Sequence, residues 1–255
     1  MTMPDRATRR VAETTGSRTL ERDDSLIAEV PCELRFNGDA FAVMMLTPTD
    51  LHEFAIGFSL SERVIAQPSD IDEIRIHELV EGIAIDITAT VHEKITARQM
   101  PGRTGCGLCG AARLEDALDV WPSVPDAPPI GSAALQNALQ SLNGLQPLNE
   151  ATGAAHAAAW ATSEGDIVLV REDVGRHNAV DKLMGALVSS GTFDPAAGFV
   201  LVTSRASYEI VNKCLRFGVR HVAAMSAPTA LAVDVARSGN MQLIAYLRDG
   251  RYVTY

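Results

Sequence analysis

Cysteine is scarce in this sequence, which has four cysteines in 255 residues. That number is too low for the disulfide scaffold of a secreted protein, so we predict a reducing, cytoplasmic location in which each thiol serves chemistry or packing. Long apolar runs are also missing, because the longest, such as 198–202 and 219–225, fall far short of the roughly 20 residues that span a bilayer. A membrane protein is therefore not expected.

Positive charge is in deficit, since 32 acidic residues outnumber 22 basic ones and give a formal net charge of −10. Nucleic acid is therefore not expected as a partner, because its binding relies on many phosphate contacts from Lys and Arg. A local basic pocket can still bind a small anion. Near the N-terminus, Arg9 and Arg10 are followed by polar and acidic residues and not by the apolar stretch of an export signal. We expect residues 1–22 to form a disordered tail.

Apolar residues, in contrast, make up 47% of the chain, which is enough for a sizeable core. Residues 23–97 are predicted to form a smaller, sheet-rich α+β domain. Asn37-Gly38 lies between two apolar runs and predicts a hairpin, and a second hairpin is predicted over 74–91. Between them, Asp50 opens a helical pattern in which Glu53 is expected to complete a capping box.

The second half of the chain is organised differently. Polar and proline-rich residues 98–130 predict a mobile loop and then a linker. Residues 131–255 are predicted to form an α/β domain that begins with helices over 132–142 and about 149–160. Strands over 167–171, 199–203, 221–225 and 243–247 then alternate with helices over 178–188, 207–217 and 229–237, and 251–255 adds an edge strand. This alternation predicts a mainly parallel sheet with helices on its faces.

Ligands of such sheets bind beyond the carboxyl ends of the strands, where this sequence is unusually polar. The segments that follow the four strands are 171–178, 203–207, 226–229 and 248–251. Several of them open helices, whose free N–H groups and dipole favour anions, and Arg176 and Arg205 add positive charge. The pattern predicts a phosphate or pyrophosphate site. An alternative stays open, in which Ser204, Ser207 and Thr229 are only helix caps and the arginines only surface ion pairs.

The segment Cys106-Gly107-Leu108-Cys109 is the clearest chemical motif, with Gly105 and Gly110 on either side. The glycines leave the backbone free and the sulfur atoms accessible. Backbone N–H groups and Arg103 are expected to lower the pKa of the Cys106 thiol from about 8.5, which favours the thiolate that attacks a persulfide. Three alternatives remain: a structural zinc site, which lacks a second pair of ligands, a thioredoxin-like redox pair and a structural loop.

The other chemically notable residues give weaker signals. Cys32 falls within a strand pattern and Cys214 within a helix pattern, so both are predicted to be small buried apolar residues. His156 lies among the glycine and alanine residues of 152–159, which permit close approach of a ligand. It is either a site residue or a core residue.

Five stretches together carry a family resemblance: 104–110, 152–159, 171–185, 203–213 and 226–233. They resemble the formate dehydrogenase accessory sulfurtransferase family (FdhD), and the resemblance covers about residues 25–255. It implies a protein that takes sulfur from a cysteine desulfurase and transfers it to a bis(molybdopterin guanine dinucleotide) molybdenum cofactor before that cofactor enters formate dehydrogenase. It also implies a homodimer.

The resemblance implies roles for particular residues. Cys106 would hold the persulfide, and Cys109 would assist or resolve it. The cofactor-contact segment of the family matches Tyr246, Leu247, Arg248, Asp249, Gly250 and Arg251. Loop position adds further candidate cofactor contacts, namely Arg176, His177, Thr203, Ser204, Arg205, Ser226 and His156. Residues 131–255 would then form the cofactor-binding domain.

The family's C-terminal domain is similar to the cytidine deaminase fold, which raises the question of a zinc hydrolase. Deaminases need His-x-Glu and Pro-Cys-x-x-Cys. His156 is followed by Ala157 and Ala158, and Cys214 stands alone on its helix, so no catalytic zinc is expected. Two other functions remain open: a chaperone that binds the cofactor without moving sulfur, and a thiol redox protein with a reversible Cys106–Cys109 disulfide.

Overall fold

The structure is a computed structural model that describes residues 3–91 and 123–255. The helices are α1 (Leu51–Ser61), α2 (Ser132–Leu142), α3 (Pro147–Thr152), α4 (Arg176–Ser189), α5 (Tyr208–Arg216) and α6 (Ala230–Ser238). The strands are β1 (Arg6–Thr15), β2 (Arg18–Ile27), β3 (Val30–Phe36), β4 (Asp39–Leu46), β5 (Ile71–Glu78), β6 (Ile83–Ala89), β7 (His156–Thr162), β8 (Ile167–Asp173), β9 (Gly198–Val202), β10 (His221–Ala224), β11 (Gln242–Arg248) and β12 (Arg251–Thr254). Within these described ranges, no helix is long and apolar enough to cross a membrane.

The smaller sheet has the strand order β4-β3-β6-β5. Its two predicted hairpins, β3–β4 and β5–β6, are confirmed as antiparallel pairs. Asn37 and Gly38 both have positive φ, 53° and 92°, as the tight turn between β3 and β4 requires. Phe54 and Phe58 of α1 are buried against the apolar face of this sheet, so α1 covers it on one side.

The predicted capping box at the start of α1 is wrong. Asp50 has left-handed backbone angles, φ 52° and ψ 38°, and its side chain caps no N–H group of the helix. Glu53 instead forms an ion pair with Arg171 of β8, with an N–O distance of 2.9 Å. A charged partner from a distant strand has therefore replaced the local cap.

The larger sheet has the order β12-β11-β10-β9-β7-β8 and is mixed, not mainly parallel as predicted. The pairs β9–β10 and β10–β11 are parallel, whereas β7–β8, β7–β9 and β11–β12 are antiparallel. The correction follows from β7, which runs against both of its neighbours and lies where the sequence suggested a helix.

The predicted helix over 149–160 is in fact α3 followed by β7. Gly153, with φ 65°, ends α3 in the left-handed conformation common after helices. Ala157, Ala159 and Ala161 favour helix in isolation, but all are buried in β7. Ala159 and Ala161 lie in the core beneath α2, where their small side chains let that helix pack closely on the strand, so tertiary packing outweighs helix propensity.

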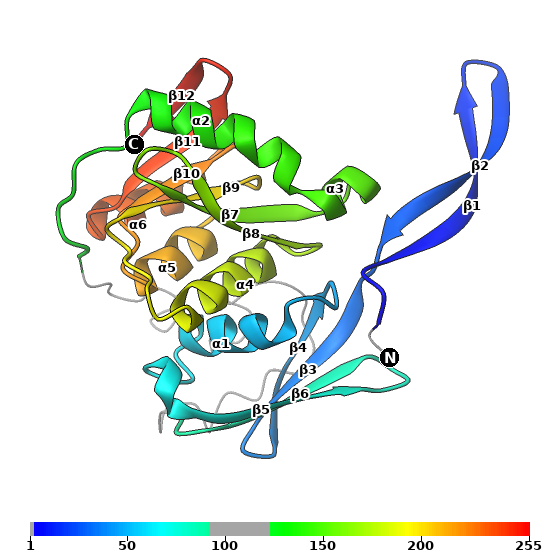
Figure 1. The fold of residues 1–255 in the computed structure, drawn as a ribbon, viewed down its shortest axis with the longest axis horizontal. Coiled ribbons are helices and arrows are strands. Elements are labelled where there is room, and N and C mark those ends of the chain that lie inside the picture. Colours follow the sequence, from blue (N-terminus) through cyan, green and yellow to red (C-terminus); the bar gives the residue numbers. More distant parts are fainter. Residues whose placement is uncertain (1–2, 92–122) are drawn as a thin grey trace.

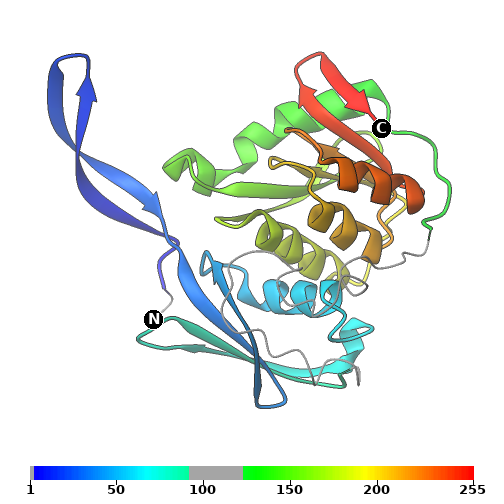
Figure 2. The same ribbon diagram turned by 180° about the vertical axis from the view of Figure 1, so that it is seen from behind.

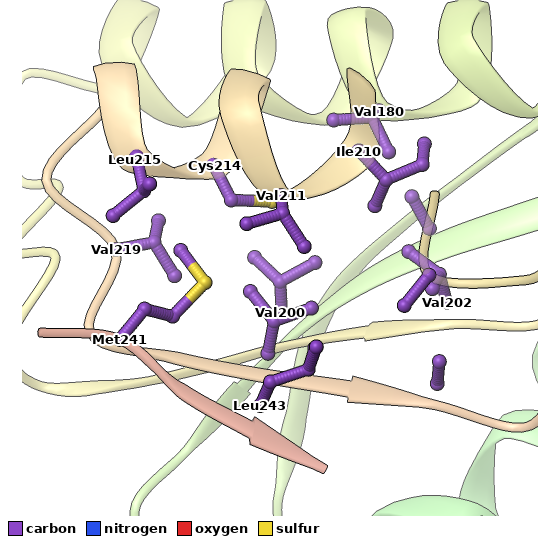
Figure 3. Close-up of a cluster of buried hydrophobic side chains, with 14 of the residues drawn as sticks. Val180, Val200, Val202, Ile210, Val211, Cys214, Leu215, Val219, Met241 and Leu243 are labelled. Carbon is purple, nitrogen blue, oxygen red and sulfur yellow. The ribbon is translucent and has the colours of Figure 1, made fainter. Parts of the chain in front are cut away.

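Helices cover both faces of the larger sheet (Figure 1). On one face α4, α5 and α6 pack on alternate strand residues such as Val200 and Val202. On the other face α2 packs on the intervening residues, such as Leu201 and Ile244. Figure 3 shows the first of these cores, in which Cys214 lies among aliphatic side chains.

The two sheets are joined through a close crossing of α1 and α4. A Cβ atom added to Gly57 would lie 1.8 Å from the carbonyl oxygen of Asp181, and one added to Gly185 would lie 1.8 Å from that of Glu53. Only glycine fits at both positions. The order of layers is therefore small sheet, α1, α4, large sheet and α2 (Figure 1).

The prediction of a disordered tail over 1–22 is also wrong for the described residues. β1 and β2 form a ten-pair antiparallel hairpin from Arg6 to Ile27, which projects away from the rest of the chain in both views (Figures 1 and 2). Cross-strand pairs such as Arg10–Glu21 and Arg22–Glu13, at 3.3 and 3.1 Å, join its polar side chains. The hairpin escaped prediction because both of its faces are mainly polar and it lacks apolar alternation.

Candidate functional site at the strand ends

The carboxyl ends of β8, β9, β10 and β11 lie at one edge of the larger sheet. β9, β10 and β11 are mutually parallel, and β8 has the same direction because both β8 and β9 run antiparallel to β7. Neighbouring strands stand about 4.8 Å apart, so the ends form a row on the order of 20 Å long. The polar loops after these strands converge on this edge.

Hydrogen bonds from backbone N–H groups join neighbouring strands and loops along the row. The N–H of Ala157 donates to Oγ1 of Thr203 at 2.9 Å, and the N–H of Thr203 donates to the carbonyl of Ala157 at 3.1 Å. Further along, the N–H of Tyr246 donates to the carbonyl of Ser226 at 3.1 Å. Thr203 and Ser226 thus stabilise the edge itself.

The first turn of α4 places Arg176 and His177 at one corner of the row, near His156. Asp173 ends β8 and accepts a hydrogen bond from the N–H of Gly175, the N-cap residue, at 2.7 Å, so Arg176 and His177 follow directly. His156 opens β7 opposite Asp173 in the strand register. Burial, followed by the charges of Arg176 and His177, lowers the pKa of His156, which places all three side chains within electrostatic range.

The helix-cap alternative holds for some of the loop hydroxyls and not for others. Thr229, the N-cap of α6, accepts a hydrogen bond from the N–H of Ala232 at 3.2 Å. Ser204 donates to the carbonyl of Arg205 within its own loop at 3.1 Å. Ser207, the N-cap residue of α5, makes no side-chain cap, and its buried Oγ has no hydrogen-bond partner. Ser207 is therefore the exception among these hydroxyls.

Glu209, in the first turn of α5, faces His177 across the same corner. Its carboxylate oxygen Oε2 lies 3.7 Å from Nε2 of His177. This neighbouring ring holds the pKa of Glu209 well below its usual range, with help from backbone N–H donation and against the effect of burial. Glu209 was not among the residues predicted from sequence.

The segment 246–251 forms the irregular end of β11 and the turn into β12. The register of the two strands shifts between Ala245 and Arg248, and Tyr246 lies in this bulge with φ 53° and is 41% exposed. The side chain of Leu247 is completely buried in the core beneath α2. Leu247 thus packs in the core and presents no side chain to the site. The exposed members of the segment are Tyr246, Arg248, Asp249, Gly250 and Arg251.

Gln136 of α2 holds this turn in place. Its amide nitrogen donates to the carbonyl of Arg248 at 3.1 Å, and its amide oxygen accepts from the N–H of Gly250 at 3.1 Å. The Arg248 guanidinium donates to the carbonyl of Met225 in the neighbouring loop. Arg248 therefore links two loops of the row.

Two buried ion pairs beneath the edge also escaped prediction. Lys182 lies 2.7 Å from Asp173, and Lys213 lies 2.9 Å from Asp181. Lys213 also donates to the hydroxyl of Ser61 in α1 at 2.7 Å. Because each pair joins side chains on different elements, no local sequence pattern predicts it.

The four cysteines divide into two pairs. Cys32 and Cys214 are completely buried, as predicted, and burial raises the pKa of each thiol to about 12. Cys106 and Cys109 lie outside the described residues. On the C-terminal side of that gap, Val124 packs in the core of the larger sheet.

Described residues form two hollows, one beside the β8 end of the strand-end row and one at the opposite end of the strands. One, of about 810 Å³, is lined by Met3 and Glu78 among others, near the base of the β1–β2 hairpin. The other, of about 340 Å³, is lined by Arg220, Arg237 and Tyr255 at the opposite end of the strands. In the described part of the chain, no group of three or more His, Cys, Asp and Glu side chains gathers as a metal site.

The fold and site define an α/β protein with a mixed sheet and a cationic edge at its strand ends. Residues 27–255 match the FdhD/NarQ family, and the chain belongs to that family.

Several relatives match this chain over nearly its full length, and they share one name. Proteins named sulfur carrier protein FdhD are 44% identical in Bordetella petrii, over 92% of this chain and 85% of that protein, and 46% identical in Cupriavidus necator, over 91% and 82%. A third, from Xanthomonas campestris, is 43% identical over 99% and 91%. The crystal structure of a Desulfotalea psychrophila protein described as a formate dehydrogenase accessory protein has a TM-score of 0.77 at 23% identity, over 99% of this chain and 97% of that one. At this level of sequence identity, the similarity shows a shared fold and nothing further.

Proposed function

We propose that this protein is a cytoplasmic sulfurtransferase that carries sulfur on Cys106. The Cys106 thiolate attacks the sulfane sulfur of a cysteine desulfurase persulfide, forms a new S–S bond and releases the thiolate of the donor. A second thiolate, from Cys109 or a small-molecule thiol, then attacks the Cys106 sulfur, which forms a disulfide and releases the outer sulfur as sulfide. The sulfide passes to a bis(molybdopterin guanine dinucleotide) cofactor, which is cargo destined for formate dehydrogenase. Membership of the family over residues 27–255 is the observation that carries this proposal.

The strand-end row supports the acceptor half of the proposal through the chemistry of its donors. Pyrophosphate groups favour helix N-termini and arginine side chains, and the starts of α4 and α5, with Arg176 and Arg205, supply both. The row is on the order of 20 Å long, which suits an elongated dinucleotide. Such a local cationic edge offsets the net charge of −10 for an anionic ligand.

Tyr246 supports recognition of a nucleobase. Its ring is exposed while the flanking Ala245 and Leu247 are completely buried, and the left-handed backbone of the bulge orients it outward. Positive φ in a bulky residue is strained and is typical of functional positions. An exposed aromatic ring provides a stacking surface for a base such as guanine.

The donor and acceptor are tested separately. Incubation with a cysteine desulfurase and cysteine should add sulfur to Cys106, and GDP should bind at the strand ends as a probe of the guanine dinucleotide. Sulfur uptake without GDP binding would contradict the proposal that the acceptor is a guanine dinucleotide cofactor. GDP binding without sulfur uptake would instead favour a chaperone that protects the cofactor, and a reversible Cys106–Cys109 disulfide without GDP binding would favour a thiol redox protein. Sedimentation should show the proposed homodimer.

A further inference from the structure

A basic pocket lies at the end of the larger sheet where β10 and β11 begin and β12 ends. It is the hollow of about 340 Å³ that Arg220, Arg237 and Tyr255 line. The strand-end row lies at the other end of the same strands, and β11 has 7 residues, so the pocket and the row are on the order of 20 Å apart. The pocket is therefore separate from the edge proposed to hold the cofactor.

Two arginine side chains in this pocket lack a counter-charge. Arg220 directly precedes β10, and Arg237 lies in the last turn of α6. Within residues 3–91 and 123–255, neither forms an ion pair with a carboxylate. Nε of Arg220 is moreover buried without a hydrogen-bond partner, and native proteins rarely keep a buried donor unpaired without a reason. Unpaired positive charge is notable in a chain with a net charge of −10.

The end of α6 does not require Arg237 as a cap. Backbone N–H groups already satisfy its last carbonyls, because Gly239 donates to Val235 at 2.9 Å, Asn240 donates to Arg237 at 3.1 Å, and Met241 donates to Ala236 at 2.8 Å. The Arg237 guanidinium is therefore available to the pocket.

Gln242, the first residue of β11, adds a neutral donor to the pocket. Its Oε1 accepts a hydrogen bond from the N–H of Ile130 at 3.3 Å and lies 2.9 Å from Nδ1 of His221. Because the backbone N–H of Ile130 can only donate, the atom that faces it must be the amide oxygen. The amide nitrogen of Gln242 is consequently left to the pocket, which Gln242 also lines.

The opposite wall of the pocket is fastened to the end of α6. The N–H of Val124 donates to the carbonyl of Gly239 at 2.9 Å. The side-chain nitrogen of Asn240 donates to the carbonyl of Val124 and to Oδ1 of Asp126, both at 2.9 Å. These bonds hold the segment that continues to Pro129, a lining residue. The pocket is thus largely preformed, as ligand pockets usually are.

We propose that this pocket binds a phosphate dianion, free or as part of a small phosphomonoester, through the guanidinium groups of Arg220 and Arg237 and the amide nitrogen of Gln242. Two guanidinium groups match the two charges of the dianion, and their planar donors pair bidentately with its oxygens. Ligand pockets measure roughly 300–1,000 Å³, so a pocket of about 340 Å³ suits a small ester and not a dinucleotide. The inference goes beyond the proposed function and does not depend on it.

The test titrates the full-length protein with inorganic phosphate at pH 8.0 and constant ionic strength, by calorimetry. Arg220→Gln and Arg237→Gln should each bind phosphate about tenfold more weakly than wild type, the effect of one charge-assisted hydrogen bond. Gln242→Glu keeps the oxygen that Ile130 and His221 contact but replaces the donor with a negative oxygen. It should therefore reduce the affinity more than either arginine variant does.

Arg75→Gln is the matched control, because Arg75 is 65% exposed on β5 and its loss changes the net charge equally. It should bind phosphate as wild type does. Acetate, which carries one charge, should bind at least about tenfold more weakly than phosphate. Glycerol 3-phosphate distinguishes the two sources, since tighter binding than inorganic phosphate identifies an ester and equal or weaker binding identifies the free ion.

The inference is overturned if wild type binds no phosphate, or if the three pocket variants bind it as tightly as wild type. Acetate binding as tight as that of phosphate would also contradict a site for a dianion. Arg237 is exposed, so Arg237→Gln should fold normally, and thermal unfolding checks each variant. None of these outcomes alters sulfur uptake by Cys106, so a failure here is distinguishable from a failure of the proposed function.

Discussion

The ammonium group of Lys182 lies 2.7 Å from a carboxylate oxygen of Asp173, and both side chains are completely buried. Lys182 also donates to the carbonyl of Thr47 at 2.9 Å, while Asp173 accepts from the N–H of Thr47 at 3.0 Å and from the side chain of Asn178 at 2.9 Å. The pair thus fastens the end of β8 and the start of α4 to the loop after β4. The corner of the site that holds Arg176 and His177 is built on this junction.

Removing one partner of this pair should strongly destabilise the protein. Lys182→Met leaves the Asp173 carboxylate buried without its counter-charge, which typically costs about 3–5 kcal/mol. We expect the thermal midpoint to fall by on the order of 10 °C, measured by circular dichroism. The control Arg75→Met removes a charge that is 65% exposed, and should cost less than about 1 kcal/mol. Equal midpoints for Lys182→Met and the control would refute the role of the pair.

The crossing of α1 and α4 should not tolerate a methyl group. Gly57→Ala places a Cβ atom 1.8 Å from a backbone oxygen of α4, so the helices must separate, at a cost of about 1–3 kcal/mol or more. Gly144→Ala is the matched control, because a Cβ atom there meets nothing within 4 Å. Chemical denaturation should show a large loss of stability for the first variant and little change for the second. Wild-type stability of Gly57→Ala would mean that the two layers are not held at this distance.

Substitution of Tyr246 should weaken ligand binding with little change in the stability of the fold. Tyr246→Gly relieves a positive φ of 53° but loosens the unfolded chain, so stability should change by less than about 1 kcal/mol. GDP affinity should nevertheless fall about tenfold, because a stacked base contributes about 1–3 kcal/mol. Tyr246→Phe keeps the ring and should bind as wild type does. Full affinity of Tyr246→Gly would remove Tyr246 from the site.

His156 should make the fold less stable as the solution becomes more acidic. Burial and the nearby Arg176 and His177 lower the pKa of His156 in the folded state, whereas an unfolded histidine takes up a proton near pH 6.5. The unfolded chain therefore binds more protons in this window, and stability is lost as pH falls from 7.5 to 5.5. His156→Asn should reduce that loss, measured as thermal midpoints over the range. If the thermal midpoint of His156→Asn falls with pH as steeply as that of wild type, His156 is not the origin of the acid sensitivity.

The sequence allowed much of the fold to be predicted where local chemistry decides it. Asn37-Gly38 fixed one hairpin, and the strands and helices from 167 onward follow apolar patterns bounded by turns. It misled at β7, where an alanine-rich segment with helix propensity is a central strand, and at the polar hairpin β1–β2. In both cases packing or cross-strand pairing, and not local preference, determines the structure.

For the site, loop position proved a better guide than side-chain type. The strand-end argument correctly placed Arg176, His177 and Arg248 on one edge, because strand direction alone sets that geometry. It could not reveal Glu209 as the neighbour of His177, since the two residues lie on different helices and meet only in the folded chain. Leu247 shows the converse limit, because the bulge between Ala245 and Arg248 breaks the alternation along β11 and turns Leu247 into the same core as Ile244.

The two cysteines of the Cys-x-x-Cys motif should differ in their effect on activity. Cys109→Ala should reduce the activation of formate dehydrogenase less than Cys106→Ala, because Cys106 is the sulfur carrier and Cys109 assists. The readout is formate dehydrogenase activity in cells that lack the native protein. An equal loss in both variants would indicate that the two thiols act as a pair.

The most direct test of the central claim is the intact mass of the protein after incubation with a cysteine desulfurase and cysteine. The account predicts a sulfur adduct on the wild-type protein, localised to Cys106 by peptide mapping and absent from Cys106→Ala. An adduct that persists in Cys106→Ala, or a wild-type protein that gains no sulfur, would contradict it.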